Sequence, residues 1–259
     1  NLPAATYEDE RFGSMFPEPA FGNKLNRRVL PDFFDVYDDP TISEFEGLKL
    51  IGHYEVDDAG VKPQRLHLVE KGKLRTVPLA TAPTKKITEP NGHARGAVSK
   101  AVTGKPSNLI FESSDQVSKE KLRQTLIELC QDVDLEYGLV IRKIRDLNAP
   151  NPNGGMRFYG MPQQDGDGLT SPLEVYKLYP DGREVPVRGL EFANVTVRTL
   201  RDILQTDNSR HLYNYLIADD YEMPASLVSP AILIEEMELG HSEGKTQRPP
   251  VLSSPLAEN

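Results

Sequence analysis

The sequence is almost free of cysteine, with Cys130 alone among 259 residues. A single cysteine excludes an intramolecular disulfide and a zinc site of the CxxC type. Long apolar runs are missing as well: stretches such as 231–234 are short, whereas a membrane-spanning helix needs roughly 20 apolar residues. We therefore expect no membrane-spanning helix and no membrane partner.

Clustered positive charge is also missing. The chain has 30 Lys and Arg against 39 Asp and Glu, so its formal net charge is −9. Because binding to nucleic acid requires grouped Lys and Arg to neutralise phosphates, no direct nucleic-acid binding is expected. Residues 1–22 have neither the basic nor the apolar region of a secretory signal peptide. The composition predicts a soluble, cytoplasmic protein.

The chain starts with Asn1 rather than methionine, and from this we expect a piece of a longer protein. Prolines interrupt an irregular lead-in at 1–22, and others mark an extended tail at 241–259. Between them the sequence predicts one domain at 23–240, with an exposed insertion at about 148–171, where Asn, Gly and Asp cluster. A chain of this length can bury a substantial core.

Short runs of alternating or β-branched residues predict more strand than helix. A hairpin is expected from 65–70 to 74–79 around a Lys-Gly turn, and another from 174–179 to 184–188 around a Pro-Asp-Gly turn. Further strands are expected at residues 29–36, 48–56, 109–112, 137–144 and 229–239.

Helical spacing is clearest at 118–132, where Ser118 can cap the helix and apolar residues, Cys130 among them, recur on one face. A second helix is expected at 197–204. Residues 82–105 lack periodicity and are rich in Gly, Pro, Lys and Asn, which predicts a long loop that is either functional or disordered. The expected fold class is α+β, predominantly antiparallel β-sheet with a few helices.

Histidine is the first candidate for chemistry, because a zinc hydrolase needs His, Cys or carboxylate ligands and a general base. The five histidines stand at positions 53, 67, 93, 211 and 241, and none is paired as HxxxH, HxH or HExxH. No GxSxG, GxGxxG or Walker motif occurs either. Cys130 lies on the apolar face of the predicted helix, so we expect a core residue rather than a nucleophile.

The most informative histidine is His93, within Asn-Gly-His-Ala-Arg-Gly at 91–96. Glycines let the backbone approach a ligand, and polar side chains beside them can hydrogen-bond peptide groups. The alternative is a surface loop with a solvated histidine, which composition by itself favours. Adjacent aspartates at 38–39, 57–58 and 219–220 offer carboxylates for a cation, although turn and cap roles are more common for such pairs. The residues alone identify no active site.

Several segments, taken in order, resemble the TldD/PmbA family, once called modulators of DNA gyrase and now regarded as metallopeptidases. Val-Leu-Pro-Asp-Phe at 29–33 and Asp-Asp-Pro-Thr at 38–41 begin the match, and Val-Asp-Asp-Ala-Gly-Val at 56–61 is similar to the family's DDEG(V/T) stretch. Asn-Gly-His-Ala-Arg at 91–95 resembles the family's SNGHGR, and the resemblance extends over 22–240. Further similar segments lie at 52–54, 68–74, 106–110, 136–140 and 230–236.

The resemblance implies the carboxy-terminal domain of a zinc metallopeptidase. Family members carry a zinc-binding HExxxH helix upstream of the segment resembling 29–41, and this chain contains no HExxxH. The family's further ligand is a cysteine in a late GxCG-like stretch, whereas the matching region 216–224 has none. Asp219 or Glu222 is a chemically possible substitute. We therefore expect zinc in the complete family protein, but no catalytic residue, tightly bound metal or activity in this chain alone.

The resemblance also implies a peptide or unfolded polypeptide as substrate, and a homodimer or a heterodimer with a related subunit. Asn91, His93 and Arg95 would bind substrate by lining its path, with Arg95 able to bind a carboxylate or carbonyl. The alternative is a non-catalytic homologue acting as a peptide-binding or partner subunit. The missing cysteine favours this alternative, whereas the retained loop favours a working cleft. A third interpretation is an unrelated β-rich interaction domain.

Overall fold

A computed structural model of the chain describes residues 24–81, 87, 89–96, 102–144, 172–193, 195, 197–219 and 221–241. The predicted lead-in at 1–22 and insertion at 148–171 lie outside these residues, as does the tail beyond 241, so the expected domain bounds stay a prediction. Within the described part of the chain, no helix is long and apolar enough to cross a membrane.

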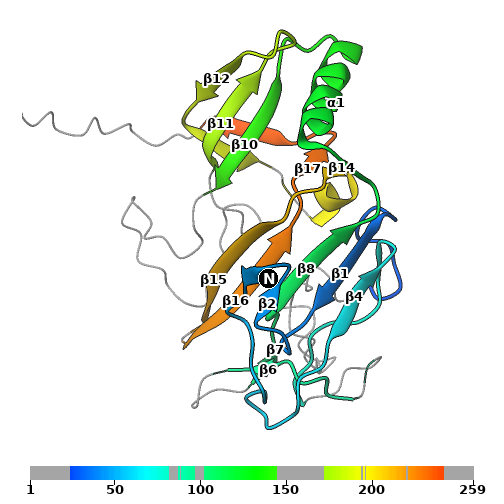
Figure 1. Cartoon of the computed structure of the whole chain (residues 1–259), viewed down its shortest axis with the longest axis vertical. Coiled ribbons are helices and arrows are strands. Elements are labelled where there is room, and N and C mark those ends of the chain that lie inside the picture. The colour runs from blue at the N-terminus through cyan, green and yellow to red at the C-terminus, as the bar shows by residue number, and fades with distance from the viewer. Residues whose placement is uncertain are drawn as a thin grey trace, which may run out of the picture.

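A six-stranded sheet organises the larger part of the fold (Figure 1). Its strands, in spatial order, are β15 (His211–Asp219), β16 (Tyr221–Ser229), β8 (Asn108–Ser113), β1 (Phe34–Asp38), β4 (Leu66–Glu70) and β5 (Lys73–Leu74). Neighbours pair antiparallel, except that β16 runs parallel to β8. This sheet, together with the smaller ones, makes the fold the predominantly antiparallel α+β class that the sequence predicts.

The core forms where alternate side chains of β1 turn inward. Phe34 and Val36 are buried and pack against Leu68 of β4 and Leu74 of β5. Because strand residues two apart share a face, Asp38 also points to the buried side. A carboxylate therefore occupies an inward position at the end of a core strand.

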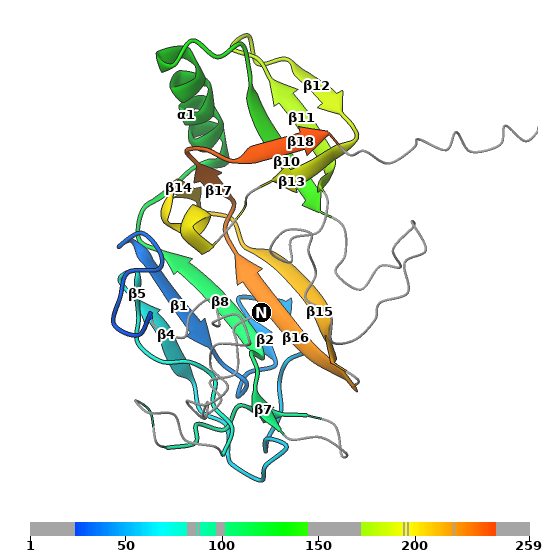
Figure 2. The ribbon, with the colours of Figure 1, turned by 180° about the vertical axis from the view of Figure 1, so that it is seen from behind.

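A smaller sheet carries the helix. It consists of β10 (Gly138–Ile144), β11 (Pro172–Leu178) and β12 (Glu184–Val187), and α1 (Lys119–Asp132) packs beside it. A Cβ on Gly138 would lie 2.7 Å from Leu126 Cδ1, so glycine lets the helix approach β10 closely. Seen from both sides, α1 and this sheet lie at one end of the molecule and the six-stranded sheet at the other (Figures 1 and 2).

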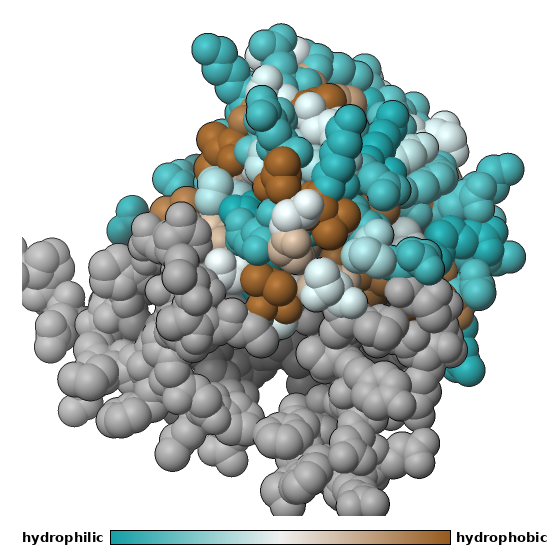
Figure 3. All heavy atoms as spheres, turned by 90° about the horizontal axis from the view of Figure 1, so that it is seen from below, coloured by the Kyte–Doolittle hydropathy of each residue, from teal (hydrophilic) through white to brown (hydrophobic). Residues whose placement is uncertain are grey.

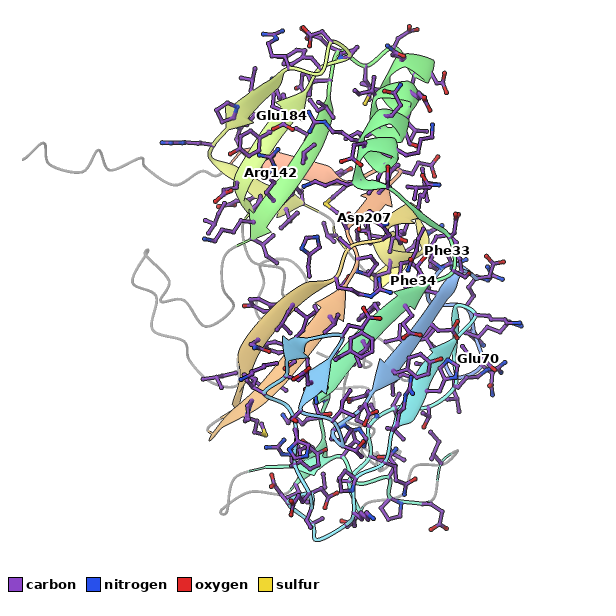
Figure 4. All side chains as sticks on the ribbon, in the orientation of Figure 1. Phe33, Phe34, Glu70, Arg142, Glu184 and Asp207 are labelled. Atoms are coloured by element: carbon purple, nitrogen blue, oxygen red, sulfur yellow. The ribbon has the colours of Figure 1, made fainter. Side chains whose placement is uncertain are left out.

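An ion-pair cluster ties the helix to the small sheet. Arg142 and Glu184 point toward one another (Figure 4), with Arg142 Nη2 donating to Glu184 Oε2 at 2.6 Å. Arg123 of α1 also donates to Glu184, and through its other nitrogen to the Gly182 carbonyl at 3.2 Å. The Arg123 hydrogen bond is the largest cause that lowers the pKa of Glu184. This carboxylate thus connects α1, β10 and β12.

Short elements complete the described fold. They are β2 (Glu44–Phe45) with β3 (Leu48–Lys49), β6 (Ala94–Arg95) with β7 (Thr103–Gly104), β13 (Leu190–Ala193) with β18 (Glu238–His241), the sheet β17 (Ile232–Ile234), β14 (Ile203–Asp207) and β9 (Gln116–Val117), and a 3₁₀ helix at Val197–Arg201. β6 lies at the end of the six-stranded sheet farther from α1 (Figure 1).

The hairpin at 174–188 and the strands at 109–112 and 137–144 are confirmed, and so is the turn after 65–70, although its second strand is only 73–74 rather than 74–79. So is the long helix, whose cap Ser118 accepts from the N–H of Lys121 at 3.2 Å. Cys130 is buried, as expected, and burial raises the pKa of its thiol.

The strand at 48–56 is wrong, because only 48–49 pair. The N–H of Leu50 donates to the Ser43 carbonyl, and those of Ile51 and Gly52 donate to side chains, Ser226 Oγ and Asn108 Oδ1. The strand at 229–239 is also wrong, because the chain breaks at Pro230 into separate short strands. The expected helix at 197–204 is a short 3₁₀ turn that leads into β14.

Candidate functional site

The predicted loop is anchored on a buried carboxylate and imidazole, Asp38 and His93, both 0% exposed. His93 Nε2 lies 3.5 Å from Asp38 Oδ2, and its Nδ1 lies 3.0 Å from the carbonyl oxygen of Asn91. Asp38 ends a core strand and His93 precedes β6, so the Asp38–His93 pair joins the central sheet to the loop.

The other side of Asp38 receives hydrogen bonds from the start of β8. The Ser107 hydroxyl donates to Asp38 Oδ1 at 2.5 Å, and the N–H of Asn108 donates to the same oxygen at 2.9 Å. The N–H of Ser107 lies 3.1 Å from both carboxylate oxygens. Burial raises the pKa of Asp38, while His93 and these donors act in the opposite direction.

Asn91 is held by the backbone beneath the loop. Its Oδ1 accepts from the N–H of Leu79 at 2.9 Å, and its Nδ2 donates to the carbonyl of Val77 at 2.9 Å. Gly92 has a φ of +72°, and a Cβ there would lie 2.4 Å from the Lys62 carbonyl oxygen. The loop is therefore packed tightly on its inner side.

The acidic turn at 57–60 is hydrogen-bonded to the loop. Asp57 Oδ2 accepts from the N–H of Ala94 at 3.0 Å, and the N–H of Asp58 donates to the Ala94 carbonyl at 2.9 Å. Asp58 Oδ2 accepts from Arg95 Nε at 3.3 Å. The Arg95 guanidinium also lies over the ring of Tyr54, 4.7 Å from its centroid. The acidic turn and the 91–96 loop, which both resemble motifs of the same family, thus form one structural unit.

The structure brings the three predicted substrate-binding residues together in one loop but buries them. Asn91 and Arg95 are each 8% exposed and His93 is inaccessible. The alternative of a solvated histidine is therefore wrong, whereas contact with substrate stays a prediction. Arg95 holds Asp58 through Nε, and its side chain is 10% exposed, so only a small part of it faces solvent.

In each of the two acidic pairs whose side chains the structure describes, one member takes a turn role. Asp39 Oδ1 accepts from the N–H and hydroxyl of Thr41 at 3.0 and 2.5 Å. Asp57 Oδ1 accepts from the N–H groups of Ala59 and Val61. The third pair, at 219–220, lies outside the described side chains.

The described residues do not fit a zinc site. Among them, no group of three or more His, Cys, Asp and Glu side chains could hold a metal ion. His93 is fully enclosed by Asp38 and the Asn91 carbonyl. The possible substitute ligands Asp219 and Glu222 fall outside the described side chains. No catalytic step can be derived through zinc from the described residues.

Sequence reasoning missed the groups around the pair. Asp38 was considered as part of an acidic pair, for a cation or a turn, and the strand expected at 29–36 ended before it. Ser107 and Asn108 lie in the family-like segment 106–110, but no local pattern places them against Asp38, 69 and 70 positions away. Tyr54 was also missed: its hydroxyl donates to the Gly92 carbonyl at 3.0 Å, and burial raises its pKa.

Tyr215 of β15 is a further member of this environment, and it yields a prediction. Burial, followed by the charge of Asp38, raises the pKa of Tyr215 to about 12. Stabilisation by the neutral phenol should be complete below about pH 10 and lost as the pH rises toward this value. We expect the difference in tyrosinate absorbance between wild type and Tyr215→Phe to have its midpoint near the raised value. A midpoint near 10 in folded protein would contradict this assignment.

The exposed surface beside the site contains apolar side chains. Seen from below, apolar groups interrupt the polar surface of the described part (Figure 3). Ile51 and Val56, 40% and 55% exposed, are the large exposed apolar residues on either side of Tyr54. They place apolar surface next to the segment 51–54, which is hydrogen-bonded to both the loop and the six-stranded sheet.

Comparison with known proteins finds a family whose model matches this chain and solved structures with a similar fold. Residues 14–164, more than half of the chain, match the family described as the PmbA/TldA metallopeptidase C-terminal domain. The structure resembles that of TldE from Thermococcus kodakarensis, with a TM-score of 0.55 and 15% identity, over 92% of this chain and 46% of that chain. It also resembles a modulator of DNA gyrase from Thermotoga maritima, with a TM-score of 0.53 and 18% identity, over 85% of this chain and 42% of that chain. The chain spans less than half the length of either protein. No curated protein matches its sequence.

Proposed function

Because the chain belongs to the PmbA/TldA metallopeptidase C-terminal domain family, we propose that it forms part of the peptide-binding cleft of a zinc-dependent peptidase. The metal-binding HExxxH segment of that peptidase is absent from this chain. The observation that carries the proposal is the family match, since it spans both the acidic turn and the loop at 91–96. Zinc, bound elsewhere in the complete protein, would supply the activated water.

The site residues differ in their exposure, and this supports different roles for them within the proposal. Asn91 and His93 are buried in this structure, so within the proposal they would shape the wall of the substrate path from beneath. Ile51 and Val56 offer apolar contact at the surface, where an extended peptide could bury its own side chains. Arg95 would act on a peptide carboxylate or carbonyl through the guanidinium nitrogens other than Nε, which donates to Asp58.

A second candidate is a non-catalytic homologue that binds peptide or a partner subunit. It is favoured by the absence of cysteine from 216–224. Both candidates include a homodimer or a heterodimer with a related subunit and a cytoplasmic location. Substituting Arg95 in the full-length protein tests the first candidate: lost peptide cleavage in a folded variant supports the peptidase, and unchanged cleavage means that the loop is only structural. Absence of cleavage by the wild-type full-length protein supports the second candidate.

Peptide binding by the chain can be tested at Val56. We expect Val56→Asp to weaken binding of fluorescent unstructured peptides about tenfold, roughly 1.4 kcal/mol, because it replaces apolar contact surface with a charge. Fluorescence anisotropy measures the change. Val133→Asp is the matched control, since Val133 is 65% exposed beyond the end of α1 and should leave binding unchanged. Equal effects of the two variants, or no binding by wild type, would contradict the proposed surface.

Zinc binding by this chain alone is expected to be weaker than micromolar. The reason is that the histidines and carboxylates of the described residues do not converge on one point. Calorimetric titration with zinc tests this expectation. Stoichiometric binding at micromolar affinity or tighter would reveal a site in this chain and overturn it.

A further inference from the structure

One buried nitrogen in the Asp38–His93 pair lacks a hydrogen-bond partner. His93 Nε2 is buried without a partner, although Asp38 Oδ2 faces it at 3.5 Å. Both side chains are 0% exposed, so solvent water cannot supply the missing hydrogen bond. Burying an unpaired polar atom is costly, and this one lies between two groups that can each carry a proton.

The other ring nitrogen determines where the protons must be. Nδ1 lies 3.0 Å from the Asn91 carbonyl oxygen, which can only accept, so Nδ1 must carry a hydrogen. If His93 were neutral and Asp38 ionised, the Nε2 lone pair would then face a carboxylate oxygen, and the contact would be repulsive. One additional proton removes the conflict, whether it resides on Nε2 or on Oδ2.

We infer that Asp38 and His93 hold one proton between Oδ2 and Nε2, and that this proton fastens the 91–96 loop to the end of β1. Asp38 is therefore a positioning residue, which acts on the loop through His93. Oδ1 accepts from the Ser107 hydroxyl and the Asn108 N–H, whereas Oδ2 faces the imidazole and shares only the Ser107 N–H. The inference holds whether or not the chain binds peptide.

The ionisable groups around the pair are few and come from several elements. Tyr54 and Tyr215 face Asp38 from the segment after β3 and from β15, and their pKa values are raised in part by its charge. The charges of Asp57, Asp58 and Arg95 also act on Tyr54, and Asp57 accepts from the N–H of Ala94 next to His93. Burial raises the pKa of Asp38 itself, in the direction that retaining a proton requires.

A shared proton has a signature in the pH dependence of folding. With ordinary values of about 3.9 for Asp and 6.5 for His, the unfolded chain retains no proton on these groups above about pH 6.5, whereas the native pair retains one. In Asp38→Asn the amide can donate to Nε2 of a neutral His93, so the native variant needs no extra proton. The ratio of the wild-type unfolding constant to that of Asp38→Asn should therefore rise about tenfold per pH unit.

Denaturant unfolding of the 259-residue chain and of Asp38→Asn, monitored by circular dichroism from about pH 5 to 8, tests the inference. We expect the ratio of unfolding constants to rise about thousandfold across this range, because other titrating groups are common to both proteins and cancel. A constant ratio would mean that the native pair holds no extra proton, and would overturn the inference.

A second measurement covers the case in which Asp38→Asn does not fold. Long-range proton–nitrogen NMR of the wild-type histidines reports whether each ring nitrogen bears, shares or lacks a proton. At neutral pH, His93 Nε2 should give the signal of a nitrogen that bears a proton or is hydrogen-bonded to one. A neutral ring with one bare, unbonded nitrogen would overturn the inference.

Discussion

Replacing Asp57 by alanine is expected to lower the free energy of unfolding by about 3 to 5 kcal/mol, because several N–H groups lose their acceptor. Asp57 Oδ1 accepts from the N–H groups of Ala59 and Val61 at 3.0 and 2.8 Å, and Oδ2 accepts from Ala94 at 3.0 Å. Ala94 is fully buried, so water cannot replace the carboxylate there. The acidic turn and the loop should then separate.

Asp58→Ala is the matched control, because it removes the same charge one residue away. The Asp58 side chain is 37% exposed and bonds the exposed N–H of Gly96 and the Arg95 guanidinium. Because the Asp58 side chain is partly exposed and accepts fewer N–H groups than Asp57, removing it should cost about 1 to 2 kcal/mol. Denaturant unfolding of both variants gives the comparison. Similar losses for the two would contradict the central role of Asp57.

Gly92→Ala is expected to cost about 2 to 5 kcal/mol, the sum of left-handed backbone strain and a steric clash. The φ of Gly92 is +72°, and a Cβ would lie 2.4 Å from the Lys62 carbonyl oxygen and 2.5 Å from Pro63 Cα. Both atoms belong to the backbone, so no side-chain rotation relieves the contact. The shift would also withdraw the Gly92 carbonyl from the Tyr54 hydroxyl.

Gly182→Ala separates the two contributions. Gly182 has a φ of +84° in the turn between β11 and β12, but a Cβ there would meet nothing within 4 Å. Only the backbone strain remains, so the expected cost is about 1 kcal/mol. Thermal or denaturant unfolding measures both. If Gly92→Ala costs no more than Gly182→Ala, the loop is not packed against 62–63 as described.

The local part of the fold was predictable where neighbouring residues carry the information. The cap Ser118, the apolar face that buries Cys130 and the Pro-Asp-Gly turn all act within a few positions, and each prediction is confirmed. Prediction failed where distant groups compete with local pattern. Residues 48–56 were predicted as one strand, but the side chains of Ser226 and Asn108 accept the N–H groups of Ile51 and Gly52 in its middle.

The longest hairpin, β15 with β16, was missed altogether. Its strands are nine residues each, yet Pro224 lies within β16 and Asp219 near the turn, so the segment lacks the usual strand pattern. Pairing with β8 stabilises it, because the parallel contact of Ser226 with Asn108 joins it to the central sheet. No local feature of the sequence reports that contact.

The sequence by itself determined the helix, two hairpins, the family resemblance and the loop on which the candidate residues lie, because all of these depend on short-range pattern. Only the tertiary structure decided what the loop does: it buries His93 against Asp38 and uses Asp57 as an acceptor for Ala94. The physical reason is that burial and proton sharing depend on which polar groups meet away from water. Those groups come from β1, the acidic turn and the start of β8, and they become neighbours only when the sheet forms.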